Sequence, residues 1–153
     1  MDPAQFFDAR QLTHHSPRVR VWREGAAPGW SLVRLDQDID DEGSVAWRGV
    51  VDAQMAEHGW ARFMILDVHA VVATNSIAMR FKSAGWAKNV LQHLEQGAIF
   101  TGANHRSGFV IRAILRIAGM SNVTLIGTED ELRAAVDRYR QGKPIEGVPV
   151  RTI

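Results

Sequence analysis

One serine hydroxyl stands where phosphate chemistry would be favourable. Thr74-Asn75-Ser76 separates the apolar run 63–68 from a segment that has helical spacing from Ile77 onwards. Free N–H groups and the positive end of the helix dipole meet at a helix start, so an anion or a phosphorylated side chain is stabilised there. Ser76 is therefore a candidate phosphorylation or anion site, with Thr74 and Asn75 beside it. The alternative is that one of the three residues simply caps the helix, a role worth about 1 kcal/mol.

A catalytic serine is a second interpretation of the same residue. Nucleophilic catalysis would need a base beside Ser76, such as His69 or His105, and an orienting acid such as Asp67. These residues fall near the ends of predicted strands, where open α/β sheets bind ligands. However, no Gly-x-Ser-x-Gly elbow surrounds Ser76. We therefore expect that the protein is not an enzyme.

A second polar loop precedes a later helix. Thr101–Gly108 contains small polar residues and a basic residue that together could hold a phosphate, although it lacks the Gly-Lys-Ser ending of a phosphate-binding loop. Asn104, Arg106 and Ser107 are its candidate anion or partner residues, and Arg80 is a further candidate on the preceding helix.

The charges are unevenly distributed along the chain. Asp36–Glu42 is an acidic run, whereas residues 76–120 hold basic side chains against the single acid Glu95. Charge runs of this kind are normally solvated turns and helix faces. The alternative is a partner-binding surface that carries both negative and positive charges.

The composition excludes several classes of protein. A net charge of +1 gives no overall attraction to nucleic acid or to a membrane surface, so we expect neither as a partner. The absence of cysteine rules out a disulfide framework and a thiolate metal site, and we expect no cofactor and no metal. The N-terminal residues lack the basic start of a signal peptide, and no apolar run approaches ~18 residues. We therefore expect a cytoplasmic protein that is not an integral membrane protein.

Hydrophobic periodicity predicts the elements that position these residues. Alternating and apolar runs bounded by glycine, proline or acidic residues predict strands, and apolar residues at helical spacing predict helices. The predicted strands are 18–23, 30–35, 61–68, 97–102 and 123–127, and the predicted helices are 43–57, 77–96, 107–118 and one that opens at the capping box Thr128–Glu131. Strands that alternate with helices indicate an α/β fold with a mixed β-sheet flanked by about four α-helices.

The predicted elements divide the chain into three parts. A loosely ordered segment, 1–17, precedes one domain at 18–142, and a tail follows at 143–153. The first two strands are expected to form an antiparallel pair whose edge, near Val19–Trp22, could pair with a second copy, so that both a monomer and a homodimer stay open.

The long helix at 77–96 is expected to turn one apolar face to the sheet. The residues spaced to form this face are Ile77, Phe81, Ala84, Leu91 and Leu94.

Two stretches resemble the STAS domain, the fold of bacterial anti-sigma-factor antagonists and of the cytoplasmic tails of sulfate transporters. The first is Leu66-Asp-Val-His-Ala-Val-Val-Ala-Thr-Asn-Ser-Ile-Ala-Met, and the second is Gly119-Met-Ser-Asn-Val-Thr-Leu-Ile-Gly-Thr-Glu-Asp-Glu-Leu. In that family a strand ends in an acidic residue and a serine that opens the next helix is phosphorylated by a partner kinase. Asp67 matches the acid and Ser76 matches the serine, and the resemblance covers about residues 30–140.

The resemblance implies a STAS-like sheet and a signalling adaptor of the anti-sigma-factor-antagonist type. Such an adaptor binds a protein partner, either an anti-sigma factor or a serine kinase, and is switched by phosphorylation at Ser76. The chain departs from the family pattern at Asn75, where aspartate is usual, and at Ile77 and Ala78, where small residues are usual.

A lipid or small-ligand carrier is the alternative class, because STAS domains are similar in topology to the lipid-carrying SEC14-type fold. Five tryptophans in a small protein are mostly expected in the core or at its edge, although two or three exposed together would mark an apolar groove.

Overall fold

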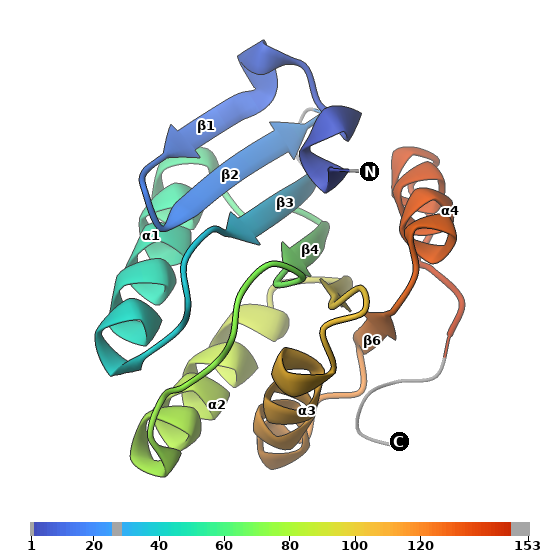
Figure 1. Cartoon of the computed structure of the whole chain (residues 1–153). Helices are drawn as coiled ribbons and strands as arrows, with labels where there is room; N and C mark the ends of the chain where they lie inside the picture. Colours follow the sequence, from blue (N-terminus) through green and yellow to red (C-terminus); the bar gives the residue numbers. More distant parts are fainter. Residues whose placement is uncertain (1, 26–28, 148–153) are drawn as a thin grey trace.

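The chain forms a mixed sheet in which the strands lie side by side in their order along the sequence (Figure 1). The computed structural model describes residues 2–25 and 29–147, except for the side chains of Pro3, Ala4 and His105. Within these residues the strands are β1 (Leu12–His15), β2 (Val19–Glu24), β3 (Trp30–Leu35), β4 (Phe63–Asp67), β5 (Gln96–Phe100) and β6 (Val123–Ile126). The first three strands pair antiparallel, and β3 to β6 pair parallel.

Helices connect the parallel strands and cover both faces of the sheet. α1 (Asp41–His58), α2 (Ile77–Leu91) and α3 (His105–Ala118) are the three crossovers, and α4 (Glu129–Arg140) follows β6. Because right-handed crossovers that step in one direction place their helices on one face, α1, α2 and α3 lie together and α4 lies on the other face (Figure 1). The predicted fold class, a mixed α/β sheet flanked by about four helices, is confirmed. No helix among the described residues combines the length and apolar character needed to cross a membrane.

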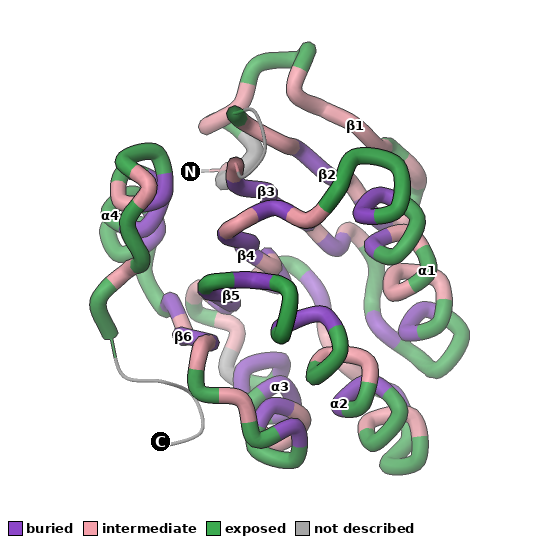
Figure 2. The backbone as a smooth tube through the Cα atoms, turned by 180° about the vertical axis from the view of Figure 1, so that it is seen from behind, coloured by how far each residue is buried: buried purple, intermediate pink, exposed green. Residues whose placement is uncertain are grey.

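Each face of the sheet carries its own hydrophobic core. The first core packs inward-facing residues of β2 to β6 against α1, α2 and α3. The second core packs the opposite strand residues against α4 and against the short N-terminal 3-10 helices Pro3–Phe6 and Ala9–Gln11. In this second core Tyr139 stacks on Phe63 with ring centroids 4.5 Å apart and planes 1° apart. Figure 2 shows the burial concentrated in the strands and on the inner sides of the helices.

The N-terminal segment contributes more structure than its sequence indicates. Residues 12–15 form β1, which pairs with β2, and two short 3-10 helices precede it. Phe6, at the end of the first of these helices, and Phe7, directly after it, pack on the second core. The strand at Val19–Trp22 is therefore an inner strand, and the prediction that it offers a free edge for dimerisation was wrong. The edge on this side of the sheet is β1.

The helix after Ser76 is shorter than predicted and buries only part of its predicted apolar face, since Ala84, Leu91 and the following Leu94 are buried as expected. It ends at Leu91, because Gln92 caps its C-terminus before the chain turns into β5. Its packing face comes from its second half, where Ala84, Val90 and Leu91 are buried. The prediction that Ile77 and Phe81 face the sheet was wrong, since these side chains are 70% and 58% exposed.

Of the predicted tail 143–153, residues 148–153 lie outside the described part of the chain, as do residues 26–28 of the predicted turn between β2 and β3.

Candidate functional site

The loop between β4 and α2, residues 68–76, ends at Ser76, which caps the helix. Ser76 has an extended backbone (φ −68°, ψ 160°), and its hydroxyl oxygen accepts a hydrogen bond from the backbone N–H of Met79 at 3.2 Å. Serine is among the preferred residues at this position, because its side chain satisfies an N–H that the helix leaves unpaired. The capping role predicted for this tripeptide therefore belongs to Ser76.

A carboxylate from another helix holds the same serine. Asp41, in the first turn of α1, accepts a hydrogen bond from the Ser76 backbone N–H at 2.6 Å and one from the Ser76 hydroxyl at 2.8 Å. We call this pair of contacts the Asp41–Ser76 clasp. It joins the N-terminal ends of α1 and α2 across 35 residues of sequence.

The clasp favours the charged form of the acid. The hydrogen bond from the Ser76 backbone N–H is the main cause that lowers the pKa of Asp41, followed by the bond from the Ser76 hydroxyl. A more distant attraction to Lys82 acts in the same direction. Ser76 therefore faces a carboxylate that stays negative at neutral pH.

Asn75 continues the connection between the two helices beneath the surface. Its side chain is buried, its Nδ2 donates to Ser44 Oγ of α1 at 3.1 Å, and its Oδ1 accepts from Arg80 Nε of α2 at 3.2 Å. Thr74 is exposed, and its backbone N–H donates to the carbonyl of Ile39 at 2.8 Å. The structure thus brings the predicted site residues Thr74, Asn75, Ser76 and Arg80 together.

The acidic run is bound largely within the protein. Asp38 accepts from the backbone N–H of Val72 at 2.9 Å, and Asp40 caps α1 by accepting from the N–H of Gly43 at 2.6 Å. Asp36 pairs with Arg20 at 2.8 Å. These contacts explain the run as a set of caps and loop anchors.

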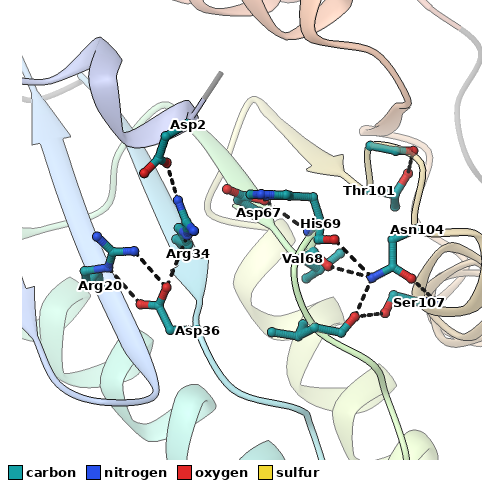
Figure 3. Close-up of polar contacts among 12 residues, drawn as sticks. Asp2, Arg20, Arg34, Asp36, Asp67, Val68, His69, Thr101, Asn104 and Ser107 are labelled. Carbon is teal, nitrogen blue, oxygen red and sulfur yellow. Dashed lines mark hydrogen bonds and ion pairs between the residues drawn. The ribbon is translucent and has the colours of Figure 1, made fainter.

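The candidate anion loop has a structural role in the same region. Asn104 caps α3 by accepting from the N–H of Ser107 at 3.3 Å, and its Nδ2 donates to the carbonyls of Val68 and His69 at 3.2 and 3.3 Å. The buried Ser107 hydroxyl donates to the carbonyl of Val71, and Figure 3 shows both side chains directed at the loop. Asn104 and Ser107 thus fix the start of the loop that ends at Ser76, whereas the fourth candidate of this group, Arg106, is exposed.

Asp67 and His69 form a pair of their own at the carboxyl end of β4. The fully buried Asp67 contacts His69 Nδ1 at 2.5 Å through Oδ1, and its Oδ2 is buried without a hydrogen-bond partner in the described residues (Figure 3). The Ser76 hydroxyl donates to Asp41, so the structure does not join it to this histidine. The side chain of His105, the other candidate base, lies outside the described residues.

Three exposed apolar side chains belong to the first two turns of the helices that the clasp joins. Ile77 directly follows Ser76, and Phe81 is one turn further along the same face of α2. Val45, 56% exposed, is one turn after Asp41 on the same face of α1. We call Val45, Ile77 and Phe81 the apolar rim.

Sequence reasoning missed both Asp41 and the exposure of this rim. The signal available for Asp41 was its place in the acidic run directly before the predicted helix 43–57, where a carboxylate interacts favourably with the helix dipole.

Comparisons with family models and with curated proteins find no relative of this chain. The chain matches no known family model, and a search of curated proteins finds no match to its sequence. The STAS resemblance therefore rests on the motif residues quoted above, and a function must be argued from the geometry around Ser76.

Proposed function

We propose that the protein is a non-enzymatic signalling adaptor, of the type that the STAS resemblance implies, which binds a protein partner at the Asp41–Ser76 clasp. The observation that carries this proposal is an exposed serine that joins the starts of two helices, each of which carries exposed apolar side chains in its first two turns, the apolar rim of Val45, Ile77 and Phe81. Exposed apolar groups gathered on one surface mark an interaction site, because a partner that covers them removes their surface from water.

Phosphorylation at Ser76 would switch this surface. A phosphate adds a charge of about −1.5 to −2 at pH 7. The new charge would lie beside the Asp41 carboxylate, which accepts a hydrogen bond from the unmodified Ser76 hydroxyl at 2.8 Å. A partner that buries the rim would then have to bury two like charges, a cost of several kcal/mol that expels it.

The proposal is tested by photo-cross-linking followed by reconstitution. A photoreactive amino acid at Phe81 should capture a discrete partner in the source cell, whereas the same group at Arg133, an exposed position on α4, should not. The captured protein is then identified and purified for binding measurements.

In the reconstituted complex, Phe81→Ala and Ser76→Asp should each weaken binding at least tenfold, and the matched control Ile117→Ala should leave it unchanged. Ile117 is a suitable control because it is also an exposed apolar residue but lies near the C-terminal end of α3, whereas Phe81 lies near the N-terminal end of α2. A Ser76→Asp variant that binds as tightly as the wild type would contradict the switch. Loss of binding in Ile117→Ala, with Phe81→Ala unaffected, would contradict the location of the surface.

A further inference from the structure

The first core contains a cavity of about 90 Å³ between the sheet and the three crossover helices. The residues that line it come from β3 to β6, from α1, α2 and α3, and from the loops before α1 and α2. They include Leu66, Ile99, Trp47, Trp86 and Ile114. Protein interiors are close-packed, with few voids larger than a water molecule, and one water occupies about 30 Å³ of the liquid. The cavity is therefore a departure from normal packing.

The partial exposure of Leu66, one of the residues that line this cavity, agrees with its presence. Leu66 lies on β4, which has β3 and β5 as its neighbours and α1, α2 and α3 above this face. A leucine in the middle of a covered sheet is normally fully buried. Leu66 is only partly buried, in contrast to Leu32 and Ile65, which are 0% exposed on the opposite face of β3 and β4.

The walls of the cavity are almost entirely apolar. Among the described residues, the polar side chains that line it are Asn75 and Ser83, and none of the lining residues is charged. The Asn75 side chain is already bonded to Ser44 and Arg80, so the Ser83 hydroxyl, which has no partner among the described residues, is the one polar group left to offer a hydrogen bond there. A buried water needs two to four polar partners, so ordered water is not stabilised in such a space. An uncharged apolar molecule would be stabilised there, because it needs no hydrogen-bond partners.

We propose that this cavity is a binding site for a small, uncharged, apolar molecule of about the size of one aromatic ring. An apolar cavity of about 150 Å³ takes up benzene or xenon, and a space of about 90 Å³ accepts xenon directly and a single ring after small shifts of its walls. Two half-buried tryptophans line it, Trp47 of α1 and Trp86 of α2, with ring centroids 4.9 Å apart.

The site is tested with xenon and benzene on the full chain. Under xenon pressure, the methyl resonances of Leu66, Ile99 and Ile114 should shift in a saturable way. The methyl groups of Leu32 and Ile65 in the second core serve as controls in the same spectrum because both side chains are 0% exposed and neither lines this cavity, and they should not shift. Equal shifts in both cores, or no saturable shift in the first, would overturn the proposal.

Charge and volume provide the remaining tests. Benzene should raise the midpoint of thermal unfolding as its concentration rises, because it binds only the folded state, whereas benzoate should not.

Ala87→Leu, which fills the cavity, should abolish the effect of benzene, and so should Ala73→Leu, which fills it from the loop before α2. Ala78→Leu, on the exposed side of α2, should keep it. Stabilisation by benzene that survives in both filled variants would place the binding elsewhere.

Discussion

Ser76 has three simultaneous roles in the fold. It caps α2, donates its hydroxyl to Asp41 and donates its backbone N–H to the same carboxylate. A residue that links two helix starts is a sensitive place for a modification, because one added group disturbs both helices. The proposed switch therefore acts on contacts within the protein as well as on a partner.

Ser76→Ala should lower the free energy of unfolding by about 1 kcal/mol, within the range of about 0.5–2 kcal/mol for a lost serine cap. The backbone bond to Asp41 stays in this variant, so the protein should remain folded. Urea denaturation measures the change, and Ser76→Thr, which keeps a hydroxyl in the cap, is the matched control. A loss in Ser76→Thr equal to that in Ser76→Ala would show that the cap is not the cause.

The Asp41–Ser76 clasp also predicts how Asp41 titrates. Because the hydrogen bonds lower the pKa of the folded carboxyl, their stabilisation is present above the unfolded pKa of about 3.9 and is lost as the pH falls through the folded pKa. Ser76→Ala should raise the pKa of Asp41 only part of the way, since the backbone N–H makes the larger contribution. Carboxyl-carbon NMR of the wild type and the variant measures both values. An identical Asp41 titration in the two proteins would contradict the hydroxyl contact.

At the scale of the elements, α2 buries only the later part of the apolar face that its sequence pattern predicts. Its first turns carry Ile77 and Phe81 in solvent, and its second half supplies the residues that pack on the sheet. The long loop that Asn104 and Ser107 anchor determines where the helix starts. The face that a helix buries thus depends on how its preceding loop is fixed as well as on the spacing of apolar residues.

α4 places the phenol of Tyr139 in the apolar second core, so the stability of the protein should fall at alkaline pH. Burial raises the pKa of Tyr139 above its ordinary value of about 10, and its hydroxyl has no partner among the described residues. Below pH 10 both states hold a neutral phenol, and above it only the unfolded chain ionises, so stability falls as the pH rises. Tyr139→Phe should be as stable as the wild type or more stable at pH 7, because it removes an unpaired polar group. It should also lose less stability between pH 9 and 11, as measured by denaturation at each pH.

Much of the fold could be predicted from the sequence, because strands such as Phe63–Asp67 are uninterrupted apolar runs and helix ends such as Gly59 carry their own signals. β1 was missed because Leu12-Thr-His-His shows no apolar alternation, and its pairing with β2 depends on tertiary contacts. Ser76 was identified as a cap candidate from its local sequence. Its partner Asp41 was not, because a contact across 35 residues leaves no local pattern.

At the scale of the whole molecule, the cavity is a cost to stability that a ligand could offset. A void of about 90 Å³ at about 24 cal/mol per Å³ corresponds to about 2 kcal/mol.

Ala87→Leu should therefore raise the free energy of unfolding by up to about 2 kcal/mol in the absence of ligand, because the added side chain fills the void. The exposed control Ala78→Leu should change it by less than about 0.5 kcal/mol. Urea denaturation of the three proteins provides the comparison. Destabilisation by Ala87→Leu would indicate that the void is too small to hold the added carbons.

The strand order has a consequence for how the chain assembles. Because each strand pairs with the one before it, a chain emerging from a ribosome can add one strand at a time to a growing edge, with a single hairpin or helical crossover to close at each step. The contacts of α4 with the N-terminal segment cannot form until almost the whole chain has been made, since the hydrogen bond from Arg140 to the carbonyl of Phe6 spans 134 residues. The second core stays uncovered by α4 until synthesis reaches that helix. In refolding experiments with pulsed hydrogen exchange, the amides of α4 should gain protection after those of β3 and β4, and simultaneous protection would contradict this sequential assembly.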